Sequence, residues 1–125
     1  MRVMVLVKAT EDSEKGFVPT PETMEMMEAM GRFVERTSKE GILVETGGLL
    51  PSKDGFRIQL RGGKLTVTAG PFSESKEVIG GWAILEVPSR AEALRVATEF
   101  MELHRAHWPE LDCESEVRPI APTGE

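Results

Sequence analysis

The feature that most constrains the fold is an apolar run near the start of the chain, Val3-Met4-Val5-Leu6-Val7. Successive side chains of an extended strand point to opposite faces of a sheet. The three valines would therefore lie on one face, and Met4 and Leu6 on the other. A strand that is apolar on both faces is typical of a sheet that is covered on both sides. We therefore expect this run to form an inner strand.

Helix signals mark two longer segments. Thr20 followed by Pro21 supplies a hydroxyl N-cap and a proline at the first helical position. Gly41 suits the left-handed residue that commonly ends a helix. A second helix is predicted to begin at a capping box of Ser89 and Glu92 and to end before the proline at position 109.

Each predicted helix carries an apolar stripe at three- and four-residue spacing. The stripe of the first helix consists of Met26, Met27, Met30, Phe33 and Val34. The stripe of the second consists of Leu94, Ala97, Met101, His104 and Trp108. Methionine fills irregular cores, and it also lines adaptable binding surfaces. For the methionine-rich stripe, filling of an irregular core is the favoured interpretation.

A hairpin is the clearest local prediction. Residues 56–61 and 64–68 alternate between apolar and polar side chains on either side of Gly62-Gly63, a pair that accepts the positive φ angles of a two-residue turn. In that register the apolar cross-strand pairs are Leu60 with Leu65 and Ile58 with Val67. Polar side chains face one another on the opposite side. A slip by one residue would mix the two faces, so the register is well determined.

The remaining strands are expected at residues 42–48, 82–85 and 113–120. Apart from the hairpin, the order of elements predicts an α+β, ferredoxin-like antiparallel sheet with two helices on one face. Two helices cover only one face, so the second face of the first strand needs other cover. We expect a homodimer in which two sheets pack face to face. The chain reads as one domain, 1–125, with a flexible tail at 121–125.

Composition limits the partners and the compartment. A net charge of −6 gives no basic footprint, so nucleic acid and anionic membrane surfaces are not expected as partners. Cys113 is the only cysteine and forms no disulfide within the chain. The first apolar run is too short for a signal peptide, and no run is long enough to span a membrane. A cytoplasmic location is predicted.

A block in the second half of the chain carries a family resemblance. It consists of Gly70-Pro71-Phe72, Glu74, Lys76-Glu77 and Gly80-Gly81. This block resembles the signature of YCII-related proteins, in the branch named for an Asp-Gly-Pro-Phe tetrapeptide. The segments at 47–52 and 117–119 are similar too. The resemblance implies a dimeric α/β barrel, but Ala69 stands where the tetrapeptide has its acid.

The polar segment of this block is the candidate site. The predicted catalytic residues are Glu77, as a shielded carboxylate base, and Lys76, as a cation for an anionic ligand. Phe72, Glu74, Trp82 and Met27 are the predicted ligand-binding residues, in a cleft between the sheet and the helices. The alternative is a solvated turn whose glycine, proline and phenylalanine only set the path of the chain.

Two classes of function remain open. One is binding of a small organic molecule, with cofactor-free acid-base chemistry, as the resemblance to dimeric α/β-barrel enzymes implies. The other is a non-catalytic interaction or regulatory module. Relatives in the Asp-Gly-Pro-Phe branch resemble partners of extracytoplasmic-function sigma factors, which implies a bacterial-type protein. The sequence leaves open whether the protein is an enzyme.

Other titratable residues favour structural roles. His104 and His107 have the i,i+3 spacing of joint metal ligands, but core or capping roles are favoured, and neither a metal nor a cofactor is expected. YCII-like proteins outside this branch are associated with a His-Asp pair in the front half of the chain, where this sequence has no histidine. Cys113 is predicted to be a buried structural thiol. The acidic segment 9–19 is either a solvated loop or a functional lid.

Overall fold

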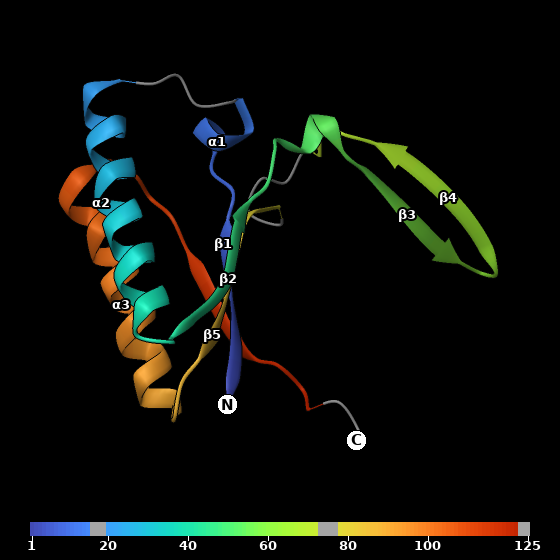
Figure 1. Cartoon of the computed structure of the whole chain (residues 1–125). Helices are drawn as coiled ribbons and strands as arrows, with labels where there is room; N and C mark the ends of the chain where they lie inside the picture. Colours follow the sequence, from blue (N-terminus) through green and yellow to red (C-terminus); the bar gives the residue numbers. More distant parts are fainter. Residues whose placement is uncertain (16–19, 73–77, 123–125) are drawn as a thin grey trace.

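The computed structural model describes residues 1–15, 20–72 and 78–122, and it contains a four-stranded sheet, a separate hairpin and three α-helices (Figure 1). The strands are β1 (Arg2–Lys8), β2 (Leu43–Gly48), β3 (Phe56–Arg61), β4 (Lys64–Ala69), β5 (Ile79–Glu86) and β6 (Ser115–Pro119). The helices are α1 (Glu11–Lys15), α2 (Pro21–Lys39) and α3 (Arg90–His107), with a 3-10 turn, η1, at Ser52–Asp54.

The main sheet has the strand order β2-β5-β1-β6, and each neighbouring pair is antiparallel. With the hairpin set aside, this is the ferredoxin-like arrangement that the sequence predicts, so the fold class is confirmed. Helices α2 and α3 lie side by side on one face of the sheet (Figure 1). The apolar strand β1 is an inner strand, as its pattern indicates.

The core lies between the sheet and the two helices. Val3, with 1% of its surface exposed, and Val5 extend from β1 toward Leu85, which is 4% exposed, on β5. Val87, Ala93 and Val96 complete this buried cluster. Strand alternation directs every second side chain of the central strands into one apolar layer, and burial of this layer supplies most of the stabilisation.

The predicted ends of α2 are confirmed. The Thr20 hydroxyl accepts a hydrogen bond from the Thr23 backbone N–H at 3.2 Å, and the Thr23 hydroxyl accepts one from the Thr20 N–H at 2.8 Å. This reciprocal pair satisfies two N–H groups that the helix leaves unpaired at its start. Gly41 has φ +76°, as expected after a helix end.

Residues 9–19 were expected to form a loop, but this segment contains the short helix α1, so the prediction is corrected there. Thr10 and Ser13 bond reciprocally, with the Ser13 N–H 3.1 Å from Thr10 Oγ1 and the Thr10 N–H 2.8 Å from Ser13 Oγ. The acidic side chains that suggested a solvated loop stand in the first turn of this helix, where its dipole favours them. Residues 16–19 lie outside the described part of the chain.

The predicted stripe of α3 is correct at Ala97 but wrong at Leu94. Ala93, Val96 and Ala97 form the buried face, whereas Leu94 is 67% exposed. Small side chains allow the helix to approach the sheet closely. Because alanine is only weakly apolar, the sequence pattern did not identify this face as the buried one. Ser89 caps the helix as predicted, accepting a hydrogen bond from the Glu92 N–H at 3.2 Å.

Strands β3 and β4 form a separate two-stranded sheet, and we call residues 56–69 the arm. The register is the predicted one, and the turn glycines Gly62 and Gly63 have φ +56° and +75°. The arm extends away from the body of the molecule on the side opposite to α2 and α3 (Figure 1).

The second face of the main sheet points toward the side of the arm. Leu6 pairs with Trp82 and Met4 pairs with Ile84, so these four residues start from the face away from the helices. They are half-buried in a single chain. Cover of this face by a second subunit remains a prediction.

Candidate functional site

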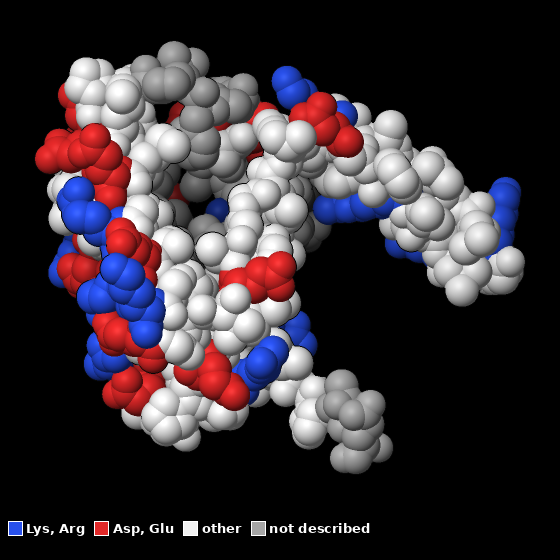
Figure 2. All heavy atoms as spheres, viewed as in Figure 1, with Lys and Arg blue, Asp and Glu red and all other residues white. Residues whose placement is uncertain are grey.

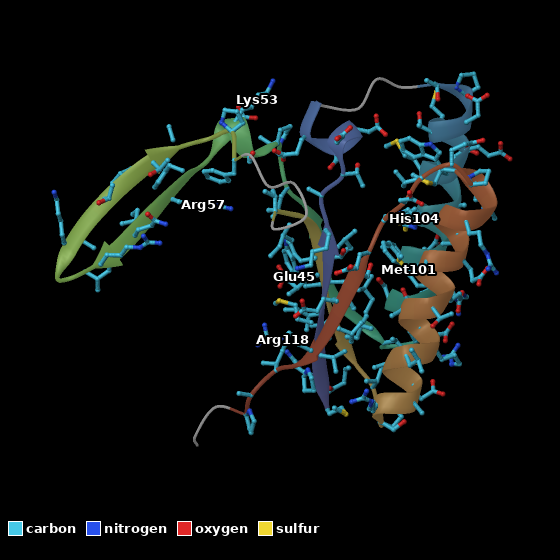
Figure 3. All side chains as sticks on the ribbon, turned by 180° about the vertical axis from the view of Figure 1, so that it is seen from behind. Glu45, Lys53, Arg57, Met101, His104 and Arg118 are labelled. Carbon is cyan, nitrogen blue, oxygen red and sulfur yellow. The ribbon has the colours of Figure 1, made fainter. Side chains whose placement is uncertain are left out.

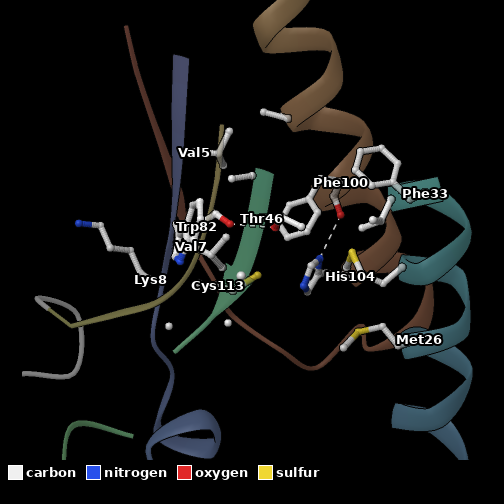
Figure 4. A pocket seen from close by; sticks show the side chains of 18 of the residues that line it. Val5, Val7, Lys8, Met26, Phe33, Thr46, Trp82, Phe100, His104 and Cys113 are labelled. Carbon is white, nitrogen blue, oxygen red and sulfur yellow. Dashed lines mark hydrogen bonds between the residues drawn. The ribbon is translucent and has the colours of Figure 1, made fainter. Parts of the chain in front are cut away.

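A cavity of about 580 Å³ lies between the main sheet and the two long helices (Figure 4). Sheet residues that line it include Val5, Val7, Leu43, Ala83 and Leu85. Helix residues that line it include Met26, Met27, Met30, Phe33, Val34, Val96, Ala97, Phe100 and His104. The wall is therefore aliphatic, aromatic and thioether-rich, with few polar groups.

Glycines explain why this end of the sheet is hollow. Gly48 pairs with Gly81, which also lies opposite Val7 on the neighbouring strand. Strand alternation places this glycine pair on the helix-facing side, where no side chain fills the space. A Cβ atom added at Gly48 would meet nothing within 4 Å. Gly48 and Gly81 thus leave a bare floor for the cavity.

The methionine-rich stripe of α2 forms one wall. Met26, Met27 and Met30 all line the cavity, and Met27 remains 67% exposed. The sequence favoured a filled core for these methionines, but the exposed Met27 and the open cavity beside the stripe fit an adaptable surface better. Met27, a predicted ligand-binding residue, stands at this wall.

Trp82, another predicted ligand-binding residue, is among the residues that line the cavity, although its side chain, like that of its partner Leu6, starts from the sheet face away from the helices. Its indole ring packs against the backbone of Gly47, where an added Cβ would lie 3.1 Å from the ring. Its backbone carbonyl accepts a hydrogen bond from Thr46 Oγ1 at 2.8 Å. A side chain at position 47 would displace the ring, so Gly47 fixes the position of Trp82.

Phe72 lies at the root of the arm and is not among the described residues that line the cavity. The Arg57 guanidinium stands 3.8 Å from the centre of its ring, a cation–π contact. The Phe72 N–H donates to Ser52 Oγ at 3.0 Å. Figure 3 shows Arg57 at this root, directed toward the body.

A buried serine organises the arm root. The Ser52 N–H donates to Glu14 Oε1 at 2.9 Å, and the Ser52 hydroxyl makes a short hydrogen bond to Glu14 Oε2. The Gly70 N–H donates to the Gly55 carbonyl at 2.9 Å, and a Cβ at Gly70 would lie 1.8 Å from the Ser52 carbonyl oxygen. Only glycine allows this close approach. Part of the signature block therefore has a structural role.

The expected arrangement of the block is corrected in one respect. From its position between two strand-like runs, we expected the block to lie at one edge of a single sheet, but the preceding strand β4 belongs to the arm and the following strand β5 is an inner strand of the main sheet. Ala69 pairs with Phe56 at the base of the arm and does not line the cavity. The proposed site residues Glu74, Lys76 and Glu77 lie outside the described residues, so their roles remain predictions.

His104, for which the sequence favoured a core or capping role, lies at the cavity wall and is a functional candidate. Its Nδ1 lies 3.0 Å from the Phe100 carbonyl oxygen, and its ring contacts the Phe100 ring edge-on with 4.7 Å between centroids. A carbonyl oxygen only accepts, so Nδ1 carries the hydrogen of this bond, and in the neutral ring Nε2 then has the free lone pair. The ring lies in the space between the sheet and α2 (Figure 4). The signal available in the sequence was the position of His104 on the apolar stripe of α3, which indicates that its side chain faces inward.

The other polar groups of the wall are neutral or paired. Lys8 is the one Asp, Glu, Lys or Arg among the described lining residues; its Nζ lies 3.6 Å from Glu116, and its side chain points away from the helices (Figure 4). Cys113 also lines the cavity. Burial, together with the neighbouring Asp112 carboxylate, raises the pKa of the Cys113 thiol, which favours the unreactive neutral form.

The described residues contain neither a metal-binding cluster nor a membrane-spanning helix. Within residues 1–15, 20–72 and 78–122, no group of three or more His, Cys, Asp or Glu side chains is placed to hold a metal ion. None of the helices described there has the length and apolar character needed to cross a membrane.

The sequence of the chain also matches a known family. The model of the YCII-related domain matches residues 1–105. The chain belongs to the YCII-related family. Comparison with curated protein sequences gave no significant match.

Among solved structures, this YCII-related chain is similar to 5-chloro-2-hydroxyhydroquinone dehydrochlorinase from Burkholderia phenoliruptrix AC1100, in complex with 2,5-dihydroxybenzoquinone. The TM-score is 0.53 at 15% sequence identity, and the match covers 97% of this chain and 94% of the other. At this identity the similarity supports the shared fold.

Proposed function

We propose that this protein binds a small, neutral and mainly apolar organic molecule in the cavity between the main sheet and helices α2 and α3. The observation that carries the proposal is the cavity itself. Its volume of about 580 Å³ falls within the range of small-molecule sites, and its wall combines apolar side chains with few polar groups. A charged ligand would find Lys8 already paired with Glu116.

The wall favours a flat ring with one hydrogen-bonding substituent. Phe33 and Phe100 offer aromatic surfaces, with ring centroids 6.2 Å apart, and the methionines of α2 can adapt to the shape of a ligand. His104 is placed to receive a hydroxyl group. The structural neighbour was solved with a small quinone, which supports the view that this fold accommodates such rings.

His104 is also the candidate for cofactor-free acid-base chemistry. The Phe100 carbonyl fixes the tautomer with the hydrogen on Nδ1, so Nε2 can accept a proton from a ligand hydroxyl. Histidine is the side chain that most often performs this role in enzymes. Glu77 and Lys76 remain proposed contributors beside it.

Binding is tested by filling the cavity. A panel of neutral phenols and quinones is screened by thermal shift, and a bound compound raises the unfolding temperature because it stabilises only the native state. Gly48→Leu places a side chain into the free space at the cavity floor and is expected to abolish the shift. Gly31→Leu is the matched control, because Gly31 is also unobstructed and does not line the cavity. Equal binding by both variants would refute the proposed location.

Proton transfer is tested with His104→Gln. Glutamine can keep the hydrogen bond to Phe100 but cannot act as a base. For any compound that the protein converts, kcat should fall by about 10²- to 10⁴-fold with little change in KM. His107→Gln, on the same helix and outside the cavity wall, should leave kcat unchanged. If both variants retain full turnover, His104 is not the base.

The alternative function and the compartment remain proposals. The arm offers exposed surface that would suit a non-catalytic interaction module, such as the sigma-factor partner that the family resemblance implies. Pull-down with a purified sigma factor tests this alternative separately from the cavity. The lone Cys113 is compatible with a reducing cytoplasm.

A further inference from the structure

The exposed lining residues mark the mouth of the cavity. Met27 on α2 is 67% exposed, and Thr46 and Gly48 on β2 are also exposed, although all three line the cavity. Figure 2 shows the surface hollowed between α2 and β2. The cavity therefore opens to solvent between the first half of α2 and the end of β2.

Helix α1 borders this opening. Thr10, which precedes α1, and Ser13 within it line the cavity together with Lys8 and Gly48, which lie at the same end of the main sheet. Figure 1 shows α1 at that end of the sheet, between the start of α2 and the root of the arm. A movement of α1 would therefore change the width of the mouth.

The two ends of α1 are held in different ways. Before the helix, the Ala9 N–H donates to the Val78 carbonyl at 2.8 Å, and Ala9 itself is buried. Near the other end, the Glu14 carboxylate accepts hydrogen bonds from the N–H and the hydroxyl of Ser52 at the root of the arm. Within the described residues, no strand or other helix packs extensively against α1. The helix is therefore fixed at its start and held near its end by one side chain.

This helix has little stability of its own. It has five residues, and the few hydrogen bonds of so short a helix do not offset the cost of forming its first turn. The reciprocal hydrogen bonds of Thr10 and Ser13 close that turn but do not attach it to the rest of the molecule. Segments of this kind open locally far more often than the whole protein unfolds. The position of α1 therefore depends on the contact between Glu14 and Ser52.

Ser52 is a firm anchor for this contact. Its side chain is 6% exposed, and its Oγ also accepts a hydrogen bond from the Phe72 N–H at 3.0 Å. The Phe72 ring in turn lies against the Arg57 guanidinium at the base of β3. The anchor is thus part of the arm root, and α1 is the partner that can move.

We propose that α1 is a gate at the mouth of the cavity, and that the hydrogen bonds between Glu14 and Ser52 are the latch that keeps it closed. The inference rests on the proposed ligand-binding function and adds how access to the cavity is controlled. When Glu14 separates from Ser52, α1 pivots about Ala9 and a ligand enters or leaves. The sequence left residues 9–19 open between a solvated loop and a lid, and this arrangement favours the lid.

The latch is tested with the same substitution at two positions of α1. Glu14→Gln removes the carboxylate that holds Ser52, whereas Glu11→Gln removes an exposed carboxylate of the same helix. Both acids stand in the first turn, so both variants lose a favourable charge near the helix dipole. Stopped-flow fluorescence of the full chain with N-phenyl-1-naphthylamine, a neutral aromatic probe that brightens in apolar surroundings, gives the association and dissociation rate constants.

An unlatched gate accelerates entry and exit alike. We expect Glu14→Gln to raise both rate constants by about tenfold, because losing hydrogen bonds to a charged group increases the open fraction. The Kd should then change by less than about threefold, and Glu11→Gln should leave both rate constants within about twofold of the wild type. Faster dissociation with unchanged association would show that α1 is a fixed part of the wall and would overturn the proposal. Equal rate constants in the two variants would overturn it as well.

Amide hydrogen exchange tests the latch without a ligand. The N–H of residue 14 donates to the Thr10 carbonyl at 3.0 Å, and in Glu14→Gln it should exchange at least about tenfold faster than in Glu11→Gln, with the β1 amides unchanged. A wild type that does not bind the probe would count against the proposed function. In that case faster exchange at residue 14 still supports the latch, and equal exchange in the two variants overturns it.

Discussion

The main sheet and the arm are built from similar strands, but they bury their apolar residues very differently. Leu85 on β5 and Leu65 on β4 are the same residue type in antiparallel strands, yet Leu85 is 4% exposed and Leu65 is 66% exposed. The difference lies in what packs on each sheet. Helices α2 and α3 cover β5, whereas the described part of the chain has nothing over β4 (Figure 1).

The comparison shows that strand patterning and burial are separate properties. Alternation fixes which side chains share a face, because it follows from backbone geometry. Whether that face becomes a core depends on distant segments. An apolar face without cover is therefore informative about partners, and the following measurements test the contrast between the two sheets.

The largest expected effect comes from truncating the same residue type in both regions. Leu85→Ala removes buried apolar volume and should lower the free energy of unfolding by about 2–5 kcal/mol. Leu65→Ala should change it by less than about 0.5 kcal/mol at a concentration where the chain is monomeric. Urea denaturation followed by tryptophan fluorescence measures both. Similar losses would contradict the difference in burial.

A smaller effect is expected where the arm joins the body. Gly70→Ala forces a Cβ against the Ser52 carbonyl and should lower the free energy of unfolding by about 1–3 kcal/mol. Gly48→Ala, in the main sheet, meets open space and should have an effect below about 0.5 kcal/mol. Urea denaturation ranks the two variants. If Gly70→Ala leaves the free energy of unfolding unchanged, the backbone at the root of the arm adjusts to the added methyl group.

The smallest effect concerns the thiol beside the cavity. The pKa of Cys113 is raised in the folded state, first by burial and then by Asp112, so the native state holds the thiol proton more tightly than the unfolded state does. Its stabilising contribution is complete below the unfolded-state pKa and is lost as the pH rises through the folded-state pKa. Between about pH 7 and pH 10 the wild type should therefore lose more stability than Cys113→Ser. If the free energies of unfolding of the two proteins fall equally with pH, the raised pKa of Cys113 is ruled out.

Much of the fold could be predicted because its signals are local. Thr20 and Pro21 mark the start of α2, and Gly62-Gly63 fixes the hairpin register. Each depends on hydrogen bonds or φ angles within a few residues. The short helix α1 was missed because its acidic residues are typical of a loop as well as of a first helical turn.

The candidate site was predicted less well. Trp82 and Met27 line the cavity, whereas Phe72 lies at the arm root and His104, favoured as a core or capping residue, lies at the cavity wall. Apolar stripes show which residues turn inward, but they do not show whether the enclosed space is filled. That depends on the sum of the side-chain volumes that meet there.

By itself, the sequence determined the two long helices, the strands and their order, the faces of each strand and the register of the hairpin, because these follow from backbone geometry and near-neighbour hydrogen bonds. Only the tertiary structure decided that Gly48 and Gly81 meet to leave a cavity, that His104 borders it, and that the arm projects uncovered. These features arise where segments far apart in the chain pack together, and packing depends on all of the contacting surfaces at once.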